Sequence, residues 1–220
     1  KDGLIPVKLS DDGTVTYADT SKVWYNYCDK VWANAVILNS GASYKVGDTI
    51  KESDIQSYFV WIPKYKYKLW NTGTASKNIH EIEIIFDTKD TTDISGVSCK
   101  TPMTSGSSGN CKNGEYMTHP AFISMGVNGF WAGKFETGYK GATSATAAQV
   151  NSSDSSKIII KPNSYSWRNS TVMNMFTSSY NYKRAMNSHM MKNTEWGAVA
   201  YLSHSKYGIN AEVNINNNSS

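Results

Sequence analysis

The sequence predicts an α+β fold with antiparallel strands, two short helices and long loops. Alternating apolar and polar residues, the pattern of half-buried strands, recur through the earlier part of the chain. The two helical patterns come late and are scattered, and no internal repeat is present. Strands that come first, followed by separate helices, are typical of the α+β class.

The composition favours a β-rich protein of the cell exterior or of a virion surface. Of the 220 residues, 40% are hydrophobic and 12% are aromatic, so a sizeable core is expected. Charged residues make up only 18%, and Ser, Thr and Asn supply most of the polarity. The net charge of +4 is too small and too dispersed to indicate a nucleic-acid partner. Because no apolar run is long enough to span a membrane, we expect membrane attachment only through a segment that precedes Lys1.

The N-terminal part of the chain predicts a hairpin and then a third strand. Residues 4–9 alternate as a short strand, and the sequence Asp-Asp-Gly at residues 11–13 predicts a tight turn into a strand at residues 14–18. Residues 32–38 are predicted as a strand because their segment is rich in aromatic and β-branched side chains. Residues 49–57 predict a charged turn or a short helix.

Residues 58–70 form the clearest strand pattern, and residues 80–87 are its expected partner. Apolar side chains occupy one face of each strand, and charged side chains occupy the other. The charged faces would place three lysines opposite two glutamates: Lys64, Lys66 and Lys68 against Glu81 and Glu83. We interpret the lysines as a solvated sheet face; the alternative is a groove for nucleic acid or an anionic polymer.

Residues 118–137 are among the most apolar and aromatic of the chain, and they predict a central strand of the core. Large aromatic residues such as Phe130 and Trp131 stand beside Gly and Ala, which suits a strand pressed against a second backbone. His119 precedes Pro120, and we expect it to form a hydrogen bond at the start of this strand rather than to bind a metal.

A short apolar strand, residues 158–160, is followed by a predicted helix. Pro162 ends the strand. Ser170 or Asn169 is expected to cap the helix. The apolar side chains of this helix are Val172, Met173, Met175 and Phe176.

A second helix is predicted over residues 192–202. Asn193 or Thr194 is expected as its cap, and Glu195 lies in the first turn, where a negative charge is favourable. The buried stripe of this helix is expected to consist of Trp196, Val199 and Ala200.

Two long loops rich in Gly, Ser and Thr, residues 89–115 and 141–156, are expected on the surface. Cys99 and Cys111 bracket small polar residues in the first loop, and a disulfide between them would contribute roughly 3 kcal/mol by closing it. Such a bond indicates an oxidising, extracellular compartment. Cys28, which lies among aromatic residues, is expected to be a buried thiol outside any disulfide.

No cofactor, metal site or catalytic residue is predicted. The cysteines lack the spacing of a zinc site, and the four histidines are not paired on one helix. The Gly-x-Ser-x-Gly turn of serine hydrolases is absent from the sequence. Calcium held by Asp90, Asp93 and Glu115 is a minor alternative, because the spacing of these residues fits no known calcium-binding loop.

Aromatic and amide side chains late in the chain form the predicted ligand-binding surface. Aromatic rings with neighbouring amides suit stacking against a sugar, or hydrogen bonding to a sugar or a peptide. The predicted ligand-binding residues are Tyr165, Trp167, Tyr180, Asn181 and Tyr182. For Trp167, packing in the core is the alternative.

Three stretches, in the same order, resemble the formylglycine-generating-enzyme (sulfatase-modifying factor) family, whose domain is a variant of the C-type lectin fold. The sequence YFVWIPKYKY at residues 58–67 resembles the family's opening strand. HPAF at residues 119–122, with GFWAGKFET at residues 129–137, resembles its F-x-I-G-K-x-E-V-T strand. MKNTEWGAVAYL at residues 191–202 resembles its P-T-E-A-E-W-E-Y-A helix. The resemblance implies structural roles for the motif residues Trp131, Glu136, Glu195 and Trp196.

The same resemblance implies a C-type-lectin-like domain over residues 58–220, incomplete at its C-terminus, with residues 1–57 as a strand-rich segment packed on it. Enzymes of this family use a cysteine pair near their C-terminal end, where they bind copper, and they hold calcium in nearby loops. This chain has no cysteine after Cys111, so no catalytic or metal-binding residue of the family carries over.

The whole chain also resembles a group of surface proteins of Gram-positive gut bacteria. The shared sequences include GLIPV at residues 3–7, WYNY at residues 24–27 and SHMMKNTEWGAVAYLS at residues 188–203. Members of that group often carry a pilin-like hydrophobic helix ahead of this region, which would account for the membrane attachment expected above.

We therefore expect a non-catalytic extracellular protein of the cell surface, an adhesin or pilus-associated module that binds a host or bacterial surface glycan or protein. The second hypothesis is a structural subunit, pilin-like or viral, that packs against copies of itself in a filament or a virion. The third hypothesis is a fragment of a formylglycine-generating-type enzyme whose catalytic half lies beyond Ser220.

Overall fold

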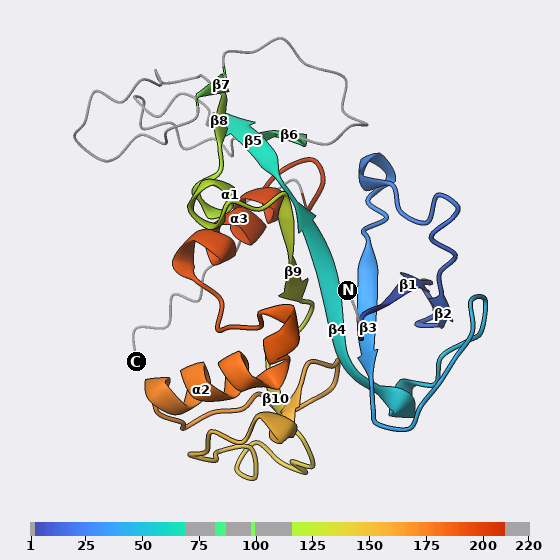
Figure 1. Ribbon diagram of the computed structural model, residues 1–220, viewed down its shortest axis with the longest axis vertical. Helices are drawn as coiled ribbons and strands as arrows, with labels where there is room; N and C mark the ends of the chain where they lie inside the picture. Colours follow the sequence, from blue (N-terminus) through green and yellow to red (C-terminus); the bar gives the residue numbers. More distant parts are fainter. Residues whose placement is uncertain (1–2, 69–81, 87–97, 100–115, 210–220) are drawn as a thin grey trace. The chain divides into compact units, whose positions relative to one another are not determined.

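The computed structural model describes residues 3–68, 82–86, 98–99 and 116–209 (Figure 1). These residues form a mixed α and β structure with mostly antiparallel strand pairs and few helices. The coarse class predicted from the sequence is therefore confirmed. No helix in the described ranges is both long and apolar enough to cross a membrane.

The chain divides into two compact units that interleave along the sequence. The first unit comprises Lys1–Asn26, Val31–Trp61 and Trp131–Met191. The second unit comprises Tyr27–Lys30, Ile62–Phe130 and Lys192–Ser220. Neither unit begins at residue 58, and the domain boundary predicted there stays a prediction.

The largest sheet has five strands in the order β2-β1-β3-β4-β9 (Figure 1). Its strands are β1 (Ile5–Leu9), β2 (Val15–Tyr17), β3 (Asn34–Leu38), β4 (Ile55–Pro63) and β9 (Gly129–Gly133). The predicted hairpin joins β1 to β2, where Gly13 adopts a positive φ of 85° and Asp12 accepts a hydrogen bond from the Thr14 N–H. The core beside this hairpin consists of Val7, Val15, Val36, Ile50, Ile55 and Tyr58. Strand prediction was therefore correct in this part of the chain.

Residues 118–137 form a strand, a helix and another strand, rather than one strand. They run from the end of β8 (Tyr116–Thr118) through α1 (Pro120–Met125) into β9. Pro120 occupies the first turn of α1, where its fixed φ favours a helix, and Gly126 ends the helix with a φ of 61°. The expectation of a central strand was also wrong, because β9 lies at one edge of the described sheet.

The strand predicted over residues 58–70 is broken by Pro63, which has no N–H to donate to a sheet. β4 ends at that residue, and β5 (Tyr65–Lys68) belongs to a second sheet of the order β6-β5-β8-β7. The partner strands are β6 (Glu83–Phe86), β7 (Ser98–Cys99) and β8. The predicted lysine-to-glutamate pairing is confirmed at Lys68 and Glu83, whose Nζ and Oε1 atoms lie 3.0 Å apart. Glu81 lies outside the described residues.

Two longer helices occupy the predicted positions, but their caps differ from the prediction. α2 (Val172–Tyr182) is capped by Thr171, whose Oγ1 accepts a hydrogen bond from the Asn174 N–H at 3.2 Å. α3 (Asn193–Ser203) begins after Lys192, whose N–H donates to Glu195 Oε2 at 2.7 Å. The cap of α2 lies one residue after the predicted Ser170, and the cap of α3 lies one residue before the predicted Asn193. Sequence patterns do not fix helix ends to within one residue.

The predicted buried stripe of α3 was wrong. Glu195, Ala198 and Leu202 face the interior, whereas Trp196 is 64% exposed. Residues at positions i, i+3 and i+7 share one helix face, and Trp196 lies about 100° round the helix from Glu195. The burial of the glutamate follows from its use in the first turn, where it accepts the Lys192 N–H.

The remaining elements are short. A two-stranded sheet pairs β10 (Gly138–Tyr139) with β11 (Ile158–Ile159). The described residues also include four turns of 3-10 helix: η1 (Tyr27–Asp29), η2 (Glu52–Asp54), η3 (Ser155–Lys157) and η4 (Arg184–Met186). Cys28 lies in η1 and is exposed, contrary to the prediction of a buried thiol, because η1 buries none of its residues. The predicted Cys99–Cys111 disulfide involves a residue outside the described ranges, as does the calcium site predicted at Asp90, Asp93 and Glu115.

Candidate functional site

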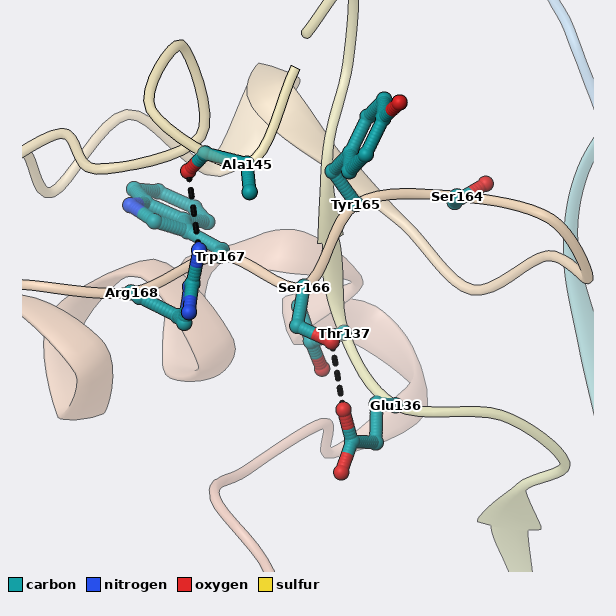
Figure 2. Close-up of a pocket in the computed structure, with 8 residues that line it drawn as sticks. All are labelled: Glu136, Thr137, Ala145, Ser164, Tyr165, Ser166, Trp167 and Arg168. Atoms are coloured by element: carbon teal, nitrogen blue, oxygen red, sulfur yellow. Dashed lines mark hydrogen bonds between the residues drawn. The ribbon is translucent and has the colours of Figure 1, made fainter.

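An open cleft of about 720 Å³ lies on the first compact unit (Figure 2). Its volume is in the range that binds small organic ligands. The lining combines two aromatic rings, one acid, one base and small polar residues: Glu136, Thr137, Ala145, Ser164, Tyr165, Ser166, Trp167 and Arg168. Tyr165 and Trp167 were both predicted as ligand-binding residues.

Five of the eight residues that line the cleft belong to one continuous segment, residues 164–168. On one side of this segment, the Trp167 N–H donates to Thr137 O at 2.8 Å and the Tyr139 N–H to Tyr165 O at 3.3 Å. On the other side, the Arg168 N–H donates to Ala148 O at 3.0 Å, and its carbonyl accepts from the Val150 N–H at 3.1 Å. The segment is therefore held by residues 137–139 at Tyr165 and Trp167, and by the loop at residues 141–156 at Arg168.

Two asparagines and one glycine shape the ends and the edge of this segment. Asn163 and Asn169 have φ values of 54° and 57°, a left-handed conformation that asparagine tolerates better than most residues. A Cβ atom on Gly138 would lie 3.1 Å from Ile159 Cγ1 and 3.2 Å from Ser164 Cβ. Any larger residue would force these neighbours to move by a few tenths of an ångström, so glycine favours the close approach of β10 to Ser164 and Tyr165.

Trp167 is half-buried and is fixed from two directions. Its Nε1–H donates to Val150 O at 2.6 Å, and the ring of Tyr139 meets it edge-on with centroids 5.1 Å apart. The sequence left ligand binding and core packing as alternatives for Trp167. In the structure its ring packs against Tyr139 and also lines the cleft. Tyr165 is 46% exposed and extends the aromatic surface of the cleft.

The charged groups of the cleft are one carboxylate and one guanidinium. Ser166 Oγ donates a hydrogen bond to Glu136 Oε2, and Arg168 Nη2 donates to Ala145 O at 3.1 Å (Figure 2). Each charged group keeps further hydrogen-bonding capacity, since a carboxylate has two oxygens and a guanidinium has five N–H groups. Figure 2 shows Ser166 pointing toward Glu136, with the Tyr165 ring pointing away from both. The cleft therefore offers donors, acceptors and aromatic surface with no net charge.

The other predicted ligand-binding residues lie on or at the end of α2 and do not line this cleft. Tyr182 has a structural role, because its hydroxyl lies 2.7 Å from the hydroxyl of Ser57, which is fully buried and accepts the Ile160 N–H at 3.1 Å. Burial raises the pKa of Tyr182 to about 12, so it stays protonated. Tyr180 is 38% exposed and stacks on Phe176, and Asn181 is exposed beside it.

The motif residues implied by the resemblance have mixed positions. Glu136, expected to be structural, lines the cleft. Trp131 packs against Trp61, with ring centroids 5.3 Å apart. Glu195 is buried and Trp196 is exposed, as described above.

His119 has a structural environment in the second unit. Its Nδ1 accepts the Ala121 N–H at 3.3 Å, so it caps α1 and does not start a strand as predicted. The rings of Tyr65, Tyr67, Phe122 and Tyr201 surround it. Burial lowers its pKa to about 4, which keeps the imidazole neutral at physiological pH.

Among the described residues, no group of three or more His, Cys, Asp or Glu side chains is placed to hold a metal ion. Sequence reasoning missed Arg168, Thr137, Ala145 and the two serines of the cleft, and it assigned Glu136 another role. The available signal was the sequence Ser-Tyr-Ser-Trp-Arg between two asparagines, which alternates like a strand and carries polar residues on one parity.

Comparison with known proteins gave no match to a family model, to a curated protein or to a solved structure.

Proposed function

We propose that this chain is a non-catalytic binding module of an extracellular cell-surface protein, and that its ligand binds in the cleft around Tyr165 and Trp167. The module is proposed to have the C-type-lectin-like scaffold that the sequence resembles, and to act as an adhesin or a pilus-associated domain. The mixed architecture with mostly antiparallel strands is compatible with that scaffold.

The observation that carries the proposal is the rigid support of an exposed aromatic surface. Backbone hydrogen bonds hold Tyr165 and Trp167 on one side and Arg168 on the other, and Trp167 is also fixed through its indole N–H. A preformed site loses little conformational entropy when a ligand binds. Tyr165, which also lines the cleft, leaves 46% of its surface exposed and available to a ligand.

An array that carries surface glycans, extracellular proteins and peptides tests this proposal. We expect the monomeric chain to bind at least one class saturably, and the substitution Tyr165→Ala to remove that binding. Tyr180→Ala is the matched control, because Tyr180 has similar exposure but lies outside the cleft. Binding that does not depend on Tyr165, or no binding to any class, would contradict the proposal.

A second candidate function, a structural subunit that packs against copies of itself, is favoured by one face of α2. Val172 is 71% exposed and Met173 is 70% exposed, and Phe176 stacks on Tyr180 with the ring planes 5° apart. No residue from Val172 to Tyr182 is charged, so two copies of this face can meet without electrostatic repulsion. Apolar surface of this kind often marks a protein contact.

Sedimentation velocity over a wide range of protein concentrations tests the second candidate. Self-association that is abolished by Phe176→Lys, but retained in Asn181→Lys on the same helix, would support a subunit role. A chain that stays monomeric at every concentration would eliminate the α2 contact and leave the binding module.

A further inference from the structure

We infer that the ligand of the cleft is an uncharged oligosaccharide, bound directly and without a metal ion; this inference rests on the proposed function. Its basis is the juxtaposition of Tyr165 and Trp167 with Glu136 and Arg168 along one fixed segment. Three properties of the cleft favour this class of ligand: the spacing of its rings, its balance of charge and the hydrogen bonds that already engage its backbone at Tyr165, Trp167 and Arg168.

The two rings favour a ligand with repeated flat apolar surfaces. Tyr165 and Trp167 are two residues apart on a strand-like segment, so they emerge on the same side, roughly 6.6 Å apart along the backbone. Pyranose rings present C–H groups on their faces and hydroxyl groups around their edges, and the faces pack well on aromatic rings. A ligand that contacts both rings must be longer than one monosaccharide.

The polar groups of the cleft match hydroxyl groups, which both donate and accept hydrogen bonds. Glu136 supplies acceptors and Arg168 supplies donors, while Ser164 and Ser166 supply hydroxyl groups of their own. Because one negative and one positive group line the cleft, an acidic sugar gains from Arg168 and loses to Glu136. The net charge of the lining therefore gives no preference for an anionic or a cationic ligand.

The backbone of the segment disfavours an extended peptide. Peptides commonly bind by adding a strand to an open sheet edge, where backbone N–H and C=O groups are free. Here the Tyr165 C=O and the Trp167 N–H are engaged by Tyr139 and Thr137, and the N–H and C=O of Arg168 are engaged by Ala148 and Val150. A peptide that added as a strand at these positions would have to displace these hydrogen bonds, whereas a sugar needs no backbone partner.

The lining also provides no set of metal ligands. Glu136 is the one carboxylate among the residues that line the cleft, and hard cations such as calcium require several oxygen ligands. Direct contacts between the protein and the sugar hydroxyls must therefore carry the binding, and a chelator should leave the affinity unchanged.

Isothermal titration calorimetry with defined probes tests this inference. The neutral probes are cellotetraose, maltotetraose, mannotetraose and N-acetylchitotetraose; the acidic probes are tetragalacturonate and 3′-sialyllactose; the peptide probe is an unstructured octapeptide containing Lys, Glu and Phe. We expect at least one neutral tetrasaccharide to bind more tightly than every other class, with the same affinity in EDTA. Tyr165→Ala should weaken that binding at least about tenfold, and Tyr180→Ala should leave it unchanged.

A second variant tests the argument from charge. Glu136→Gln keeps an oxygen that can accept the Ser166 hydroxyl but removes the negative charge. We expect this variant to gain affinity for tetragalacturonate severalfold relative to the neutral probes. An unchanged ratio would overturn the role of charge balance in selecting the ligand.

The outcomes separate this inference from the proposed function. Binding of an acidic or peptide probe that depends on Tyr165 would overturn the neutral-sugar inference and leave a binding module. A strict requirement for a metal ion, or no binding of any neutral probe, would also overturn it. If no probe binds in a manner that depends on Tyr165, and the array gives the same result, both conclusions fail. Circular dichroism of each variant shows whether a lost signal reflects unfolding.

Discussion

The indole N–H of Trp167 donates a hydrogen bond of 2.6 Å to the carbonyl oxygen of Val150. This bond connects the segment that lines the cleft to the loop at residues 141–156, which the sequence predicted only as a polar surface loop. In the same loop, the carbonyl oxygen of Ala145 accepts a hydrogen bond from the Arg168 guanidinium. The loop therefore supports the candidate site directly.

The substitution Trp167→Phe should lower the free energy of unfolding by about 1–2 kcal/mol, because it leaves the Val150 carbonyl without its donor. Trp196→Phe is the control, since Trp196 is largely exposed. Chemical denaturation measures both variants. Equal stability of the two variants would show that the bond to Val150 contributes nothing.

The substitution Gly138→Ala should destabilise the first unit by about 1–3 kcal/mol, because the new methyl group would meet Ile159, Ser164 and the Tyr165 carbonyl. Gly133→Ala should cost less, since its closest contact is the flexible end of Ile160 at 3.3 Å. Thermal unfolding measures the loss of stability in the two variants. Because Gly138→Ala should displace residues 164–168, it should also weaken ligand binding in the cleft. Unaltered ligand affinity in this variant would contradict the close approach of β10 to that segment.

Tyr182→Phe should cost about 0.5–1.5 kcal/mol of stability through the lost hydrogen bond to Ser57, and it should not change ligand binding. Tyr180→Phe should change neither quantity. Denaturation and calorimetry on both variants measure the two effects. Loss of affinity in Tyr182→Phe without loss of stability would restore the interpretation of Tyr182 as a ligand-binding residue.

His119 should make stability depend on pH. Its pKa is about 4 in the folded chain and about 6.5 in an unfolded one, so the unfolded state binds the proton more readily. The stabilising effect is fully present above pH 6.5 and is lost as the pH falls toward 4, by roughly 3 kcal/mol in total. Denaturation at successive pH values should show this slope in the wild type.

His119→Asn tests the assignment, because asparagine also caps helices but does not titrate in this range. The slope between pH 6.5 and pH 4 should become shallower in this variant. His189→Asn, which changes an exposed histidine, should retain the slope of the wild type. A slope that is the same in all three proteins would refute the role of His119.

The strands were the most predictable part of the fold, because their side-chain alternation is a local signal. Lys68 and Glu83 were matched correctly from opposite charges on two alternating patterns. α1 was missed although its signals are present, since apolar residues after Pro120 were interpreted as a strand. A six-residue helix is too short for its period to outweigh β propensity.

The candidate site was only partly predictable. Tyr165 and Trp167, which line the cleft, were selected because aromatic residues with neighbouring amides suit a ligand. Glu136 and Ala145 were not associated with them, because backbone hydrogen bonds between distant segments bring these residues together. Tyr180 and Tyr182 were included on the same pattern of aromatics beside an amide, but both lie in α2 and do not line the cleft.

Mapping of ligand contacts by nuclear magnetic resonance is the most direct test of the central claim. The amide signals of the chain are followed while the tightest-binding probe of the calorimetric panel is added. The account predicts the largest shifts at residues 136, 137, 145 and 164–168, which line the cleft. Shifts confined to α2 or to the second unit would contradict a binding site in this cleft.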